Sequence, residues 1–173
     1  SSHFLLEAFE TLTHLKVSYG GLSGTRKPTG QHENLVIKVP NLESLCLSHN
    51  LLKSPRFLVE MSRLPFLLKL DLSHNKLSTF KHHEDRLPNL QQLILSHNKL
   101  KTIHGVERML SLSSLWLDNN LFDDFSIISG LARLPEVIDI RLTGNPVSMA
   151  SPKLFRIDFL DLFREKRMHL LPR

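Results

Sequence analysis

Three histidines recur at one position of a repeated motif, which raises the question of a metal site. The tetrapeptide Leu-Ser-His-Asn occurs three times and supplies His49, His74 and His97. Imidazole nitrogen is a common ligand of zinc, copper and nickel. Metal sites usually also contain thiolate or carboxylate ligands, and neither recurs beside these histidines. We therefore expect no bound metal and no cofactor, and we place these histidines at the exits of successive strands.

Catalytic motifs are absent from the sequence. There is no Gly-x-Ser-x-Gly segment and no phosphate-binding loop, and the single cysteine, Cys46, has no base paired with it. Asp118 and Asp139 fall on one predicted face, but two carboxylates are weak evidence for catalysis without a pocket around them. We expect no enzyme activity and no catalytic residues.

The strongest pattern in the chain is the 11-residue motif L-x-x-L-x-L-x-x-N-x-L, seen clearly in Leu67–Leu77. Four further copies align on the asparagine at intervals of 22 to 25 residues, and a weaker first copy has Gly20 instead. The leucines are expected to point inward from a short strand. Each asparagine is expected to bond backbone groups where the chain leaves that strand. The predicted asparagine ladder consists of Asn50, Asn75, Asn98, Asn120 and Asn145.

A strand this short cannot bury its apolar side chains alone, so the repeats must stack on one another. The predicted fold is an α/β solenoid with a curved parallel β-sheet on its concave side and short helices and 3₁₀ turns on its convex side. We expect one domain over residues 1–173. It comprises a cap helix at 1–10, about six repeats at 12–147 and a C-terminal cap at 148–173.

The return segments between strands carry apolar residues at helical spacing. Ile103, Val106 and Leu110 are one such set, and we predict that they share one buried helical face. The pair Ser151-Pro152 is typical of a helix start and opens the predicted C-terminal cap. The other predicted helical faces are Phe57, Leu58, Met61 and Leu64, and Phe125, Ile128, Leu131 and Leu134.

These repeats resemble the leucine-rich repeats of intracellular proteins, in the short class of 22 to 25 residues. Residues 134–167 are similar to the terminal repeat and cap of the nischarin family, which includes a related kinase-interacting scaffold. Asn145, Pro146 and Val147 match the family's Asn-Pro-apolar step. Phe155 and Arg156 match its cap-opening pair, with Phe in place of Tyr, whereas the ending LLPR departs from the family's acidic turn. The resemblance implies a non-catalytic cytoplasmic scaffold that binds small GTPases, kinases, or cytoskeletal or endosomal proteins.

Side chains between the inward leucines are expected to face solvent on the concave side. Ile94 and Trp116 take equivalent positions in neighbouring repeats, so we expect them to lie side by side and exposed. An exposed tryptophan beside an isoleucine, rimmed by both signs of charge, is typical of a protein-binding hot spot. The predicted protein-binding residues are Trp116, Ile94, Asp71, Lys69, Gln92, Asp118, Asp139 and Arg141.

Bulk composition bears on location. No apolar run of about 18 residues is present, so we expect no membrane span, and the first residues do not resemble a signal peptide. Secreted repeat proteins of this kind usually close their ends with disulfides. One cysteine cannot form such a cap, which favours a reducing, cytoplasmic compartment.

Two alternatives to protein binding follow from the sequence. The net charge of +5 and the lysines and arginines of the middle repeats permit a nucleic-acid or ribonucleoprotein role. Basic side chains on convex turns more often only solvate a surface, and they could equally face anionic lipid. The one Trp and the one Tyr are far apart in the repeats, however, so no base-stacking platform is expected. The second alternative is a purely structural spacer, and the sequence leaves the oligomeric state open.

Overall fold

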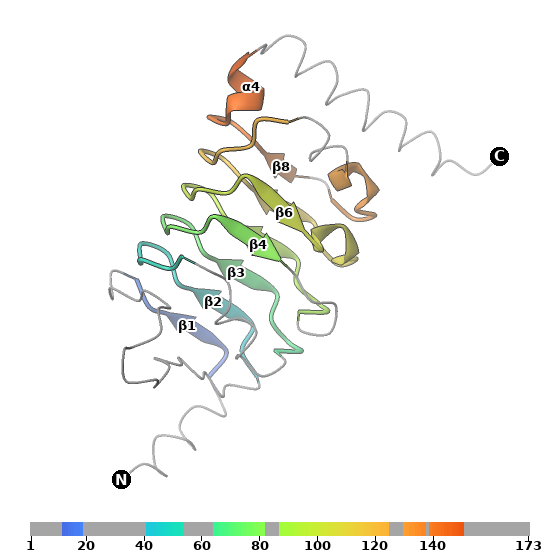
Figure 1. The fold of residues 1–173 in the computed structure, drawn as a ribbon. Helices are drawn as coiled ribbons and strands as arrows, with labels where there is room; N and C mark the ends of the chain where they lie inside the picture. The colour runs from blue at the N-terminus through green and yellow to red at the C-terminus, as the bar shows by residue number, and fades with distance from the viewer. Residues whose placement is uncertain are drawn as a thin grey trace, which may run out of the picture.

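The chain folds as a parallel-strand solenoid, which confirms the predicted fold class (Figure 1). A computed structural model describes residues 12–18, 41–53, 64–81, 87–124, 130–137 and 139–150. The predicted N-terminal cap and the Ser151-Pro152 helix start lie outside these residues. The main sheet has six strands in the order β1-β2-β3-β5-β7-β8. These strands are His14–Lys16 (β1), Ser44–Cys46 (β2), Lys69–Asp71 (β3), Gln92–Ile94 (β5), Ser114–Trp116 (β7) and Asp139–Arg141 (β8).

Equivalent residues of successive repeats are register partners throughout this sheet. The pairs Leu45↔Leu70 and Leu70↔Leu93 are examples. Each strand is three residues long, and its central side chain points into the core. Leu45, Leu70 and Leu93 have no exposed surface. Burying one leucine in this way contributes about 2 kcal/mol, and it requires a neighbouring repeat on each side.

The asparagine ladder closes the turn that follows each strand. The Nδ2 group of Asn75 donates to the carbonyl of Leu72 at 3.0 Å and to that of Leu47 in the preceding repeat at 2.9 Å. Its Oδ1 accepts the N–H of Leu52 at 3.0 Å. One side chain thus satisfies backbone groups of two repeats that water cannot reach. Asn98, Asn120 and Asn145 make the same set of bonds, and Asn50 donates to the carbonyls of Val17 and Leu47.

The convex side contains more extended chain than the sequence predicts. Strands β4 (Thr79–Lys81) and β6 (Thr102–His104) pair as a second parallel sheet. Ile103 lies in β6 rather than in a helix, and Leu110 is 66% exposed, so the predicted face of Ile103, Val106 and Leu110 is wrong. A return segment of so few residues must cover the width of the coil, and extended chain rises about twice as far per residue as a helix.

Within the described residues, the return segments also contain two 3₁₀ helices, η1 (Val106–Arg108) and η2 (Gly130–Arg133). Val106, Leu131 and Leu134 are buried, whereas Phe57, Leu58, Met61, Phe125 and Ile128 lie outside the described residues.

A short helix begins directly after the last asparagine of the ladder. This helix, α4 (Pro146–Ala150), starts with proline, whose fixed φ suits the first helical position. The N–H of Asn145 donates to Ser148 Oγ at 3.2 Å, and Ser148 Oγ donates to the carbonyl of Asn145 at 2.8 Å. These bonds hold the helix start against the last repeat. Among the helices of the described segments, none combines the length and apolar character that crossing a membrane requires.

Candidate protein-binding face

The concave face consists of the side chains that point away from the core on the main sheet. Because the register never slips, these side chains form continuous columns along the sheet. One column holds Lys69, Gln92, Ser114 and Asp139, and the next holds Asp71, Ile94, Trp116 and Arg141. The structure therefore brings seven of the eight predicted binding residues onto the strands of one face, and the eighth, Asp118, lies two residues beyond the end of β7.

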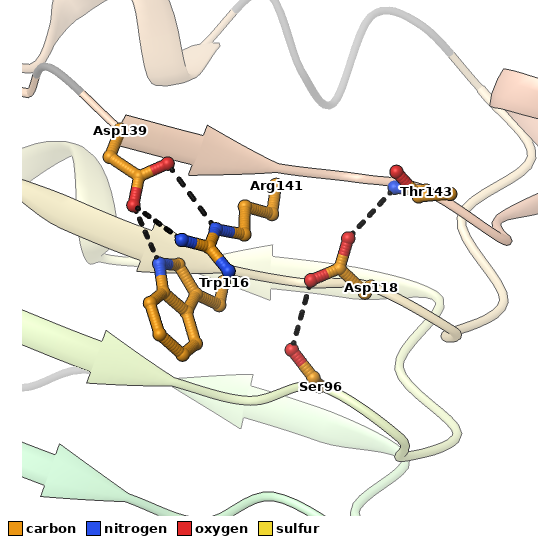
Figure 2. Close-up of polar contacts among 6 residues, drawn as sticks. All are labelled: Ser96, Trp116, Asp118, Asp139, Arg141 and Thr143. Carbon is orange, nitrogen blue, oxygen red and sulfur yellow. Dashed lines mark hydrogen bonds and ion pairs between the residues drawn. The ribbon is translucent and has the colours of Figure 1, made fainter.

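Trp116 is held by two residues of the neighbouring strand β8 (Figure 2). Its indole Nε1 donates to Asp139 Oδ2 at 2.8 Å. The Arg141 guanidinium lies over the ring, with Cζ at 3.8 Å from the ring centroid. Asp139 and Arg141 also form an ion pair, with Nε and Oδ1 at 3.5 Å. A cation over an indole face is attracted by the ring quadrupole, so the three side chains hold one another in place.

The prediction that Ile94 faces solvent is wrong. Ile94 is only 6% exposed, and Trp116 is half-buried rather than fully exposed. The two residues are register partners on adjacent strands, about 4.8 Å apart. At that spacing no water fits between bulky side chains, so members of one column shield each other. Their equivalent positions in the repeat correctly predicted that Ile94 and Trp116 are neighbours, but not how much of each side chain is exposed.

Asp71 binds groups of its own molecule. Its Oδ1 accepts the N–H of Ser73 at 2.9 Å and the Ser73 hydroxyl at 2.7 Å. The Cys46 thiol donates to its other oxygen at 3.6 Å. Asp71 therefore closes the turn after β3 and is half-buried.

Asp118, two residues after the end of β7, also accepts hydrogen bonds from neighbouring repeats of its own molecule. Its Oδ1 accepts the N–H of Thr143 at 3.0 Å, and its Oδ2 accepts the Ser96 hydroxyl at 3.3 Å (Figure 2). The sequence analysis passed over Ser73, Ser96 and Thr143. Their shared position two residues after each strand was the available signal.

His49, His74 and His97 form a stack at the strand exits. Neighbouring rings have centroids 4.1 Å apart and planes within 8° and 10° of parallel. All three residues have left-handed backbone, with φ between 53° and 57°. Parallel rings present their nitrogens side by side rather than toward one point. Within the described segments, no group of three or more His, Cys, Asp or Glu residues is arranged to hold a metal.

The stack affects the charge of its middle member. Burial lowers the pKa of His74, and the neighbouring imidazoles of His97 and His49 lower it further, while Asp71 acts in the opposite direction. His97 Nε2 also lies 3.3 Å from Asn119 Nδ2. Asn119 follows in the same column and shares the left-handed backbone.

The repeat matches a known family model. A model for leucine-rich repeats, comprising two copies, matches residues 88–133. The solved structure of a leucine-rich repeat protein from Leptospira interrogans is similar, with a TM-score of 0.62 and 25% identity. That match covers 84% of this chain and 34% of the other. The fold is a leucine-rich repeat solenoid.

Two other solved structures share the fold. An internalin from Listeria monocytogenes matches with a TM-score of 0.58 and 18% identity, over 79% of this chain and 43% of the other. A plant peptide hormone receptor in complex with RGF2 matches with a TM-score of 0.55 and 22% identity, over 78% of this chain and 20% of the other. No curated protein matches the sequence.

The present chain spans about a third of the Leptospira protein and less than half of the internalin. The narrower resemblance of residues 134–167 to the nischarin family stays a prediction, because residues 151–167 lie outside the described part of the chain.

Proposed function

We propose that this leucine-rich repeat domain is a non-catalytic scaffold that binds a protein partner on its concave face, around Trp116. The observation that carries the proposal is the arrangement of Trp116, Asp139 and Arg141. The indole is half-buried and held on two sides before any partner arrives. A side chain that is already ordered loses little conformational entropy on binding, and Trp and Arg are enriched among the residues that dominate binding energy.

The surroundings of this group suit a protein surface. Lys69 is exposed and Gln92 is half-buried in the adjacent column. Asp139 and Arg141 add opposite charges beside the indole, with side chains 39% and 50% exposed. An apolar centre with a mixed polar rim is the usual anatomy of a protein interface. Solenoids of stacked repeats provide extended concave surfaces for such binding.

The compartment proposed for this role is the cytoplasm. Cys46 is a free thiol, and it is half-buried beside the Ser48 hydroxyl at 3.2 Å. Free thiols persist in reducing compartments.

Affinity capture of partners with immobilised protein tests the proposal. We expect Trp116→Ala to capture at least tenfold less partner than the wild type, because an aromatic hot spot contributes about 2 kcal/mol or more to the binding free energy. The matched control is Leu110→Ala, which truncates a 66% exposed apolar residue away from the concave face. Equal capture by both variants, each folded as judged by circular dichroism, would show that the partner does not use this face.

A further inference from the structure

Each middle repeat exposes one residue directly after its ladder asparagine. These residues lie in line, because the N–H groups of the last three donate to carbonyls of the preceding repeat, each at 2.8 Å. The next residue in each repeat points into the core, so this one points outward. All four are exposed. The residues are Leu51, Lys76, Lys99 and Leu121.

Two more lysines, Lys53 and Lys101, are exposed two residues further along their repeats. We call the six residues Leu51, Lys53, Lys76, Lys99, Lys101 and Leu121 the basic rim. Its four lysines come from three consecutive repeats and so span only about 10 Å along the stack. This span is comparable with the Debye length at physiological salt, so their charges act together on a partner.

Among the described residues, no acidic side chain interrupts the basic rim. Segments 47–53, 72–81 and 95–104 contain no Asp or Glu, and the positive region ends at Asp123 and Asp124. None of the four lysines forms an ion pair with the described residues. The positive charge is therefore directed outward.

We propose that the basic rim binds the surface of an anionic phospholipid membrane. The lysines would lie against headgroup phosphates, and Leu51 and Leu121, which are 42% and 41% exposed, would enter the interface at either end of the column. Each lysine near an anionic membrane contributes about 1 kcal/mol, or roughly fivefold in affinity. Exposed apolar side chains add to this attraction by burial at the headgroup boundary.

The pattern favours lipid over nucleic acid. Single-stranded nucleic acid binds most strongly where aromatic side chains stack on its bases. Among the described residues, the aromatic side chains next to the basic rim offer little such surface. Phe80 and Phe122 are 0% and 1% exposed, and the rings of His49, His74 and His97 are stacked on one another. Leucines at both ends of a lysine column have a clear use at a membrane and none along a phosphate backbone. The basic rim also differs from the concave face, so lipid and protein could bind at the same time.

Sedimentation of the intact chain with vesicles tests the proposal. The comparison is between vesicles of phosphatidylcholine alone and vesicles that also contain phosphatidylserine. We expect binding only to the second kind, and weaker binding as salt is raised. Absence of binding to the phosphatidylserine vesicles would overturn the proposal, and so would tighter binding to a single-stranded RNA than to these vesicles.

Single substitutions then locate the surface. Lys76→Gln and Lys99→Gln should each weaken vesicle binding roughly fivefold. The matched control, Lys16→Gln, removes the same charge from an exposed position on the main sheet and should change binding less than about twofold, since it lies away from the docked edge. Leu51→Ser should weaken binding without changing its salt dependence. Equal effects of Lys16→Gln and Lys76→Gln would overturn the assignment, because binding would then follow net charge alone.

Discussion

The indole N–H of Trp116 donates to the carboxylate of Asp139 at 2.8 Å, across the boundary between β7 and β8. Neither residue is fully exposed, and each depends on the other for its orientation. The same carboxylate pairs with Arg141, which lies over the indole. The candidate binding group is thus a product of two adjacent repeats and does not exist within either one.

Replacing Asp139 should loosen Trp116. Asp139→Ala removes both the acceptor and the ion pair, and we expect a loss of about 1 kcal/mol in unfolding free energy together with lower fluorescence anisotropy of the single tryptophan. Asp139→Asn keeps an acceptor for the indole and should preserve more of the anisotropy. If Asp139→Ala left the anisotropy unchanged, Trp116 would be fixed by packing rather than by this hydrogen bond.

Removing one member of the asparagine ladder should destabilise the domain severely. Asn98→Ala leaves the buried N–H of Leu77 without its acceptor. It also removes one of the two side-chain donors of the Leu72 and Leu95 carbonyls, which keep their bonds to Asn75 and Asn120. One unsatisfied buried group and two further lost hydrogen bonds together cost about 3 kcal/mol. The matched control is Asn89→Ala, which removes an exposed bond to the carbonyl of Pro65 and should cost less than about 1 kcal/mol. Urea unfolding of the two variants gives the comparison, and similar midpoints would contradict the role of the ladder.

Gly144 should not tolerate a side chain. It has φ of +74°, and a Cβ there would clash with Asn119 Oδ1. Gly144→Ala must adopt left-handed backbone at a cost of about 1 to 2 kcal/mol, and the amide of Asn119 must turn away from His97. Gly130→Ala is the control, because a Cβ there meets nothing within 4 Å. Thermal unfolding should show a lower Tm for Gly144→Ala only, and adding Asn119→Gly should restore part of the loss.

The histidine stack should make stability depend on pH. The pKa of His74 is lowered in the folded state, so folding disfavours its protonated form. Stability is therefore complete above the unfolded pKa of about 6.5 and falls as the pH drops below it. His74→Asn keeps a residue that accepts left-handed backbone, as Asn119 does in the same column. Its Tm should fall less than that of the wild type between pH 7.5 and 5.5, values that bracket the ordinary histidine pKa of about 6.5. An equal fall in Tm for the wild type and the variant would mean that the histidine stack does not cause the pH dependence of stability.

The sequence predicted the parts of this molecule that repeat and missed the parts that depend on side-chain size. Inward leucines and ladder asparagines follow directly from a motif with fixed spacing. The burial of Ile94 could not be predicted from the repeat, because it depends on the size of the side chains on the neighbouring strands, about 4.8 Å away. Strand β6 was missed because Ile103 and Val106 fit a helical period equally well, and only the width of the coil decides between the two structures. The link from Trp116 to Asp139 joins different repeats, which a column-by-column comparison does not show.

Site-specific photo-crosslinking tests the central claim, binding of a protein partner on the concave face, most directly. A benzophenone amino acid at Gln92, in the column beside Trp116, is compared with the same group at Lys81, an exposed position of β4 on the convex side. Crosslinking to the captured partner from position 92 and not from position 81 is the predicted result. Crosslinking from position 81 with none from position 92 would contradict it.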